Sequence, residues 1–306
     1  MIFRHEYADG VWVDLEKPSE DEIRDIAREF SLDARIEREL LSPSPAPVVI
    51  DGGDHALAVF HFPLRGGEED DATIQEIDVI VGARWIITAH YEVVAPLHRL
   101  KKILEARHLV IRSEPVTTDI LLEVLFAHLY AAMRDQTSHL TDRLERAEKS
   151  MFDGHERATV RVISDISRSF LHLEATLANQ EEPLHRFLHA HILKDFFGDS
   201  FEERAERIFT ERAQVLRLVK THRAIATEMR ETNTALLEVR QNEIMKTLTT
   251  ITVIVLPLEL IAFIFGMHLP GTPFETEPRA FLIVIAIMLC AVALMTLFFA
   301  KKKWIF

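Results

Sequence analysis

Two ionisable side chains occur where the sequence is otherwise dominated by hydrocarbon. Glu259 interrupts the apolar segment at residues 247–265, and His268 follows shortly after that segment in the sequence FIFGMHLPG. A carboxylate that faces lipid is energetically costly, so Glu259 is expected to face a partner helix or a wet cavity. Carboxylate oxygens and imidazole nitrogens are both ligands of divalent metal ions. We therefore take Glu259 and His268 as the candidate metal ligands.

A stripe on one helical face extends from Glu259 towards both ends of its segment. It is obtained by stepping back from Gly266 in alternate intervals of four and three residues, the spacing of one helix face. The stripe consists of Phe263, Glu259, Leu256, Thr252, Thr249, Met245, Asn242, Glu238, Ala235, Glu231 and Glu228. A helix face with so many polar side chains packs poorly in a hydrophobic core, but it suits the wall of a cation channel. The acidic end of the stripe would form a cytoplasmic funnel. Two alternatives stay open: a solvated face for Glu228, Glu231 and Glu238, and a hydrogen bond to a neighbouring helix for Glu259.

Two long apolar segments must position these residues. Residues 247–266 and residues 280–300 are each long enough to cross the hydrocarbon core of a bilayer as one helix. The second contains no charged residue and is followed by Lys301, Lys302 and Lys303. We predict two transmembrane helices, the first of them lining a pore; a buried helical hairpin in a soluble protein is the alternative.

The flanking charges predict the orientation of these helices. The basic tail, residues 301–306, is expected in the cytoplasm together with everything before residue 247. The loop at residues 267–279 would face outwards, where Glu275 and Glu277 would attract cations. Both chain termini are therefore expected in the cytoplasm.

The composition narrows the class of protein. The chain has 306 residues, of which 48% are hydrophobic, and a formal net charge of −13, which argues against nucleic-acid binding. The single cysteine, Cys290, excludes a disulfide framework and a cysteine-based zinc site. We find no Walker loop, HExxH or GxSxG motif, so the sequence predicts neither an enzyme nor a nucleotide partner, and no permanently bound cofactor.

The residues before the apolar segments divide into three parts. Residues 1–112 mix strand and helix patterns and predict an α/β domain, in which Ser19 caps a helix and Glu22 completes a capping box. Residues 113–200 predict an antiparallel helix pair whose second helix runs from Glu156 towards Lys194. Residues 201–246 predict a stalk helix continuous with the first transmembrane helix, because residues 201–265 contain no glycine and, before Pro257, no proline.

The segment QNEIMKTLTTITVIVLPLELIAFIFGMHLPGTPF resembles the CorA-type metal ion transporters, which carry a Gly-Met-Asn signature at the outer end of the first span. The local matches are Asn242-Glu243, Met245-Lys246, Leu248-Thr249, Pro257-Leu258 and Gly266-Met267. The resemblance extends over the whole architecture and implies an α+β membrane protein: a cytoplasmic α/β domain, a helical stalk and two C-terminal transmembrane helices, assembled as a homopentamer. It also implies Asn242, Met245 and Leu256 at the pore wall, and Gly266, Met267 and His268 at the pore entrance.

Two residues depart from the family pattern. His268 replaces the signature asparagine, and Glu259 replaces a threonine on the pore face. Imidazole suits zinc, nickel or cobalt better than magnesium, which prefers oxygen ligands and retains its waters. The LPGTPF loop is also similar to that of the zinc-transporting ZntB branch. The departures favour a transition metal, but altered selectivity or impaired conduction is the alternative.

The expected function is transport of divalent cations (Zn²⁺, Co²⁺, Ni²⁺ or Mg²⁺) across a bacterial-type cytoplasmic membrane. A passive channel and a proton-coupled transporter both fit the residues. The alternatives are a Mg²⁺ channel gated by cytoplasmic metal and a non-conducting metal-sensing relative.

Overall fold

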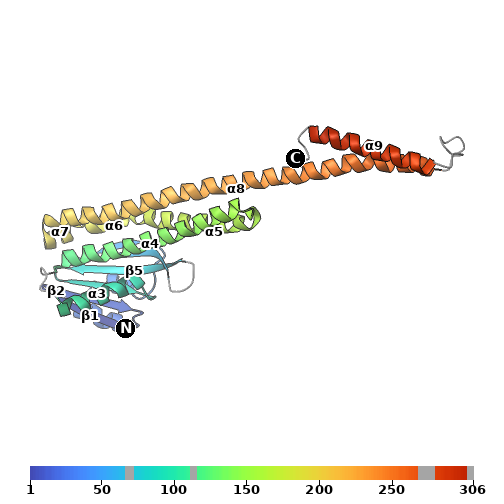
Figure 1. Ribbon diagram of the computed structural model, residues 1–306. Coiled ribbons are helices and arrows are strands. Elements are labelled where there is room, and N and C mark those ends of the chain that lie inside the picture. The colour runs from blue at the N-terminus through green and yellow to red at the C-terminus, as the bar shows by residue number, and fades with distance from the viewer. Residues whose placement is uncertain (66–71, 111–115, 268–279, 302–306) are drawn as a thin grey trace. The chain divides into compact units, whose positions relative to one another are not determined.

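The computed structural model describes residues 1–65, 72–110, 116–267 and 280–301, and the chain divides into two compact units, Met1–Arg230 and Glu231–Phe306. The strands are β1 (Ile2–Tyr7), β2 (Gly10–Glu16), β3 (Val48–Asp51), β4 (His55–Arg65), β5 (Ala72–Gly82) and β6 (Trp85–His90). The helices are α1 (Glu20–Glu29), α2 (Ala34–Glu39), α3 (Ala95–Val110), α4 (Thr118–Phe152), α5 (Glu156–Asn179), α6 (Glu181–Leu188), α7 (His191–Phe197), α8 (Ser200–Gly266) and α9 (Ala280–Lys301) (Figure 1). The predicted α/β domain, long helix and two apolar C-terminal helices are confirmed.

The strands of the N-terminal unit form one sheet in the order β1-β2-β6-β5-β4-β3. Neighbouring strands are antiparallel except β2 and β6, which are parallel and pair Asp14 with Thr88. β1 lies at one edge of the sheet, and its alternating burial leaves half of its side chains exposed. The parallel pair matters because it joins residues that lie far apart in the chain.

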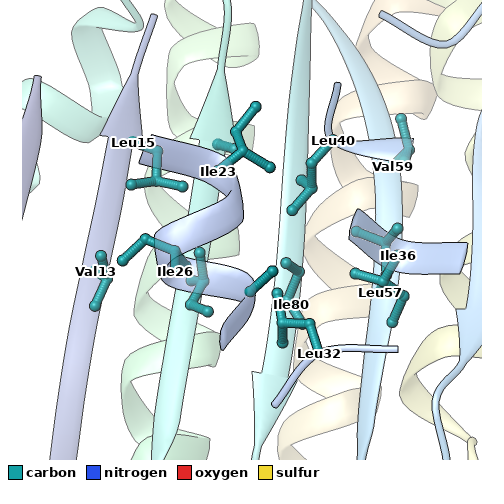
Figure 2. Close-up of a cluster of buried hydrophobic side chains, with 13 residues drawn as sticks. Val13, Leu15, Ile23, Ile26, Leu32, Ile36, Leu40, Leu57, Val59 and Ile80 are labelled. Atoms are coloured by element: carbon teal, nitrogen blue, oxygen red, sulfur yellow. The ribbon is translucent and has the colours of Figure 1, made fainter. Parts of the chain in front are cut away.

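One face of the sheet packs against α1 and α2. Val13, Leu57 and Ile80 project from this face towards Ile26 and Ile36 of the two helices, all of them at most 2% exposed (Figure 2). The predicted capping box at the start of α1 is confirmed, since the Ser19 hydroxyl accepts a hydrogen bond from the backbone N–H of Glu22 and the Glu22 carboxylate accepts one from the backbone N–H of Ser19. The cap fixes the residue at which α1 begins and hence which face of α1 packs against the sheet.

The opposite face of the sheet packs against the helices that follow it. Phe60 of β4 lies with its ring centroid 5.4 Å from that of Phe126 in α4 and 6.2 Å from that of Phe187 in α6. The ring centroid of Phe62 lies 5.8 Å from that of Tyr130 in α4. Because successive side chains of a strand alternate between faces, β4 supplies both cores, and the unit has three layers.

The second helix of the predicted pair ends earlier than the sequence indicated. The expectation was one helix from Glu156 towards Lys194, but α5 ends at Asn179 and α6 and α7 follow. Pro183 explains this break, because proline lacks the N–H that would continue the hydrogen-bond ladder. Gln180, at the break, accepts a hydrogen bond from the Tyr130 hydroxyl at 3.2 Å and donates one to the carbonyl of His61 at 2.6 Å.

A buried ionic group lies between β2, β6 and α3. The Asp14 carboxylate is fully buried and contacts the Lys101 ammonium, the Thr88 hydroxyl and, at 3.2 Å, Nε2 of His90. Thr88 also accepts a hydrogen bond from the Trp12 indole at 3.0 Å. Burial by itself would raise the pKa of Asp14, but the hydrogen bond from His90 and the charges of His90 and Lys101 together hold that pKa below its ordinary value.

We predict that Asp14→Asn destabilises the N-terminal unit by about 3–5 kcal/mol at pH 7, because it leaves the buried Lys101 without its counter-ion. A carboxyl group with a lowered folded-state pKa stabilises the protein above its unfolded pKa, about 3.9, and this contribution is lost as the pH falls through the folded pKa. The difference between variant and wild type should therefore shrink below about pH 4. The free energy of unfolding of both proteins is measured by denaturant unfolding, followed by the fluorescence of Trp12 and Trp85.

The control is Asp142→Asn, which changes an exposed carboxylate on α4. It should leave the unfolding midpoint unchanged. An Asp14→Asn protein as stable as the wild type at pH 7 would show that the buried ion pair contributes nothing.

The C-terminal unit contains the end of α8 and all of α9. Both helices contain windows apolar and long enough to cross a membrane, with mean hydropathies of 2.3 and 3.0. The end of α8 at Gly266 and the start of α9 at Ala280 coincide with the predicted limits of the two spans. Pro257 lies inside α8 and does not end it.

Candidate functional site

The predicted stripe is exposed on the isolated chain along the apolar part of α8. Leu256 and Phe263 are 60% and 74% exposed, and Met245 is 54% exposed. Asn242, Thr249, Thr252, Glu259 and Gly266 are exposed as well, and so is Met267, directly after the helix. Packing within a single chain therefore leaves these side chains uncovered.

The opposite face of the same helix segment is packed. Thr250 is 7% exposed, and Ile254, Leu258, Ile261 and Phe265 are half-buried. At 100° per residue these positions lie about half a turn from the stripe. Phe299 of α9 is 6% exposed, so α9 also has a buried position within this unit. The face that packs inside the unit is thus not the face that carries Glu259 and the hydroxyl groups.

The polar groups of the stripe can meet a hydrated cation. The Thr252 hydroxyl donates its hydrogen to the carbonyl of Leu248 at 2.9 Å, which leaves its oxygen lone pairs as acceptors. Glu259, two turns further along, adds a carboxylate on the same face. Water molecules around a divalent cation are hydrogen-bond donors, so these oxygens match a cation that keeps part of its hydration shell.

Gly266 is the last residue of α8, and packing within one chain does not require a glycine at this position. A Cβ atom added there would have no heavy atom within 4 Å. The backbone N–H of Met267 still donates to the carbonyl of Phe263 at 3.2 Å, so the helical hydrogen bonding continues to the last described residue before the gap.

The remaining predicted site residues fall into two groups. Glu228 in the N-terminal unit, and Glu231 and Glu238 in the C-terminal unit, are exposed. His268, Glu275 and Glu277 lie outside the described residues. Across the ranges that the structure describes, no three His, Cys, Asp or Glu side chains are arranged to hold a metal ion.

Comparison with known proteins identifies the family. The chain matches the CorA-like Mg²⁺ transporter protein family over residues 7–302, which is nearly its whole length. The chain belongs to this family. As a CorA-family protein it is a transporter of divalent metal cations, and the family is not a class of enzymes. Its two apolar helices have the length and composition of membrane spans.

One curated relative and two solved structures illustrate what this chain is similar to, and the solved structures share its fold. The cobalt/magnesium transport protein CorA of Methanocaldococcus jannaschii is 22% identical over 297 residues, covering 96% of this chain and 91% of that protein. The complete structure of the CorA magnesium transporter from the same organism matches with a TM-score of 0.83 at 21% identity, covering 98% of this chain and 93% of the other. The ZntB cytoplasmic domain of Vibrio parahaemolyticus matches with a TM-score of 0.59 at 11% identity, covering 76% of this chain and 89% of the other.

Proposed function

We propose that this chain is the subunit of a homopentameric channel for divalent cations in which α8 lines the central pore. The exposed polar stripe carries the proposal, because it lies opposite the face of α8 that packs within the unit. A helix in a membrane hides a glutamate from lipid by turning it towards other subunits or water. A closed ring of identical subunits provides neighbouring subunits and a water-filled centre, and each stripe then faces the symmetry axis of the ring.

The proposed pore has three zones. Gly266, Met267 and His268 form the outer entrance, and Glu275 and Glu277 attract cations to it. Leu256, Phe263 and Met245 narrow the passage, and the oxygens of Glu259, Thr252, Thr249 and Asn242 meet the ion. Glu228, Glu231 and Glu238 form a cytoplasmic funnel of negative charge, which favours the passage of cations.

The proposed cargo is a divalent metal of the zinc, cobalt, nickel and magnesium class, with zinc favoured by the imidazole of His268. The M. jannaschii relative is named for cobalt and magnesium transport, so a Mg²⁺ channel gated by cytoplasmic metal is the second candidate. Uptake of each metal into liposomes that contain the purified protein separates the two. Zinc uptake faster than magnesium uptake supports the first candidate; magnesium uptake that excludes zinc overturns it.

The membrane orientation gives a further prediction for a bacterial-type cytoplasmic membrane. Both termini should be cytoplasmic, because the lysine-rich tail follows α9 and the loop before it contains Glu275 and Glu277. A reporter enzyme that works only outside the membrane should be inactive when fused after Phe306, and one that works only in the cytoplasm should be active. The reverse pattern would refute this orientation.

A further inference from the structure

A cavity of about 640 Å³ lies in the N-terminal unit, outside the proposed pore. It is bounded by α4, α5 and the paired residues Pro63 of β4 and Ile74 of β5. Its volume falls in the range of sites for small organic ligands, about 300–1,000 Å³. None of the lining residues belongs to the proposed pore.

The polar lining of this cavity is mainly basic. Arg143 projects from α4, and Arg161, Arg168 and His172 come from α5, with Asp165 as the one acidic group among the lining residues. Arg161, Arg168 and His172 are spaced by seven and four residues, so they lie on one face of α5. This concentration of positive charge is unusual for a chain whose formal net charge is −13.

The three arginines of the cavity differ in their ion pairing from other arginines of the N-terminal unit. Arg134 pairs with Glu211 at 2.8 Å, Arg207 with Glu123 at 2.6 Å, and Arg223 with Glu174 at 2.6 Å. For Arg143, Arg161 and Arg168, by contrast, no ion pair is found among the residues that the structure describes.

Unpaired guanidinium groups that converge on one cavity match the geometry of phosphate oxygens. Guanidinium groups bind phosphates through two parallel hydrogen bonds, and several together select for more than one phosphate group.

The rest of the lining suits an organic portion of the same ligand. Pro63, Ile74 and Leu173 provide apolar surface, and Ile74 is 58% exposed although it is large and apolar. Gln136 is 3% exposed, and its side-chain oxygen accepts no hydrogen bond from the part of the chain that the structure describes. That oxygen can accept a hydrogen bond from a ligand hydroxyl or amino group. Gln136 and Arg143 are separated by about 10 Å along α4, which matches a molecule with a ring at one end and phosphates at the other.

We propose that this cavity binds a nucleoside di- or triphosphate, with the phosphates on Arg143, Arg161 and Arg168 and the ring against Pro63 and Ile74. The lack of a Walker loop argues against hydrolysis of such a ligand, not against its binding, so the proposal departs from the expectation of no nucleotide partner. It does not depend on the proposed transport, since binding is measured without ion flux.

Titration calorimetry of the full-length protein in detergent tests the proposal, with ATP, inorganic tripolyphosphate and adenosine as probes. ATP should bind with the highest affinity, tripolyphosphate more weakly, and adenosine without detectable heat. Arg161→Gln and Arg168→Gln should each weaken ATP binding by about tenfold, because each removes a charge-assisted contact. Arg38→Gln, an exposed arginine on the opposite side of the sheet, should bind ATP like the wild type. Equal affinity for ATP in the wild type and in both α5 variants would overturn the proposal, as would equal loss in Arg38→Gln.

The chain itself offers a competing source of negative charge. Glu68, Glu69, Asp70 and Asp71 lie between β4 and β5 in sequence and outside the described residues. A variant with all four changed to the corresponding amides should bind ATP within about threefold of the wild type if the cavity serves a free ligand. Absence of ATP binding to the wild type, with binding only to this variant, would overturn the proposal and assign the arginines to these carboxylates.

Discussion

Glu259→Gln should reduce the flux of divalent cations by about tenfold or more, the change that corresponds to about 1.4 kcal/mol of lost stabilisation along the ion path. The substitution keeps the size and hydrogen-bonding capacity of the side chain and removes its charge. In a pentamer, Glu259 would form a ring of carboxylates within the membrane. Such a ring of negative charge attracts a divalent cation strongly in a region of low dielectric, so it should stabilise an ion inside the membrane. The flux is measured with a metal-sensitive dye inside liposomes that contain the purified protein.

Glu243→Gln is the matched control, because Glu243 is an exposed glutamate of α8 that lies off the stripe. It should conduct like the wild type. Assembly of both variants should be intact by size-exclusion chromatography. Wild-type flux in an assembled Glu259→Gln protein would mean that this carboxylate instead bonds to a neighbouring helix, the alternative that the sequence left open.

His268→Asn should remove most of the dependence of metal uptake on external pH. An imidazole ordinarily titrates near pH 6.5, and its protonation places positive charge at the proposed pore entrance. Wild-type uptake should thus fall as the external pH drops through about 6.5, since imidazolium repels an approaching cation. The variant should keep its uptake over this range and shift its preference towards magnesium, because an amide offers oxygen in place of nitrogen.

The control for this effect is His191→Asn, which changes an exposed histidine at the start of α7. It should retain the pH profile of the wild type. A His268→Asn protein with an unchanged profile and unchanged ion preference would exclude the imidazole from metal capture.

The features that the sequence predicted well depend on neighbours along the chain. The capping box at Ser19 and Glu22 and the limits of α8 and α9 follow from residues a few positions apart. The membership of the exposed stripe also depends on local sequence, since one uninterrupted helix fixes which side chains share a face. The comparisons established the family but leave the roles of the individual stripe residues as proposals.

The features that the sequence did not reveal depend on contacts between distant segments. Asp14 and Lys101 are far apart in the chain, and the parallel pairing of β2 with β6 brings Asp14 beside Thr88 and His90. The basic cavity was missed for the same reason, because Arg143 and Arg161 belong to different helices. Pro183 is a local signal for the end of α5, but the sequence prediction extended this helix beyond it.

The most direct measurement of the pore assignment is chemical access to α8 during ion flux. Cys290 is the single cysteine, so Cys290→Ser gives a background without thiols. Leu256→Cys places a thiol on the stripe, and Ile251→Cys places one about 140° away around the helix. The two positions are similarly exposed in the isolated chain, 60% for Leu256 and 54% for Ile251. A water-soluble, charged thiol reagent should block cation flux through the Leu256→Cys protein and leave the Ile251→Cys protein unaffected. Equal block at both positions, or block at Ile251→Cys alone, would contradict a pore lined by this face of α8.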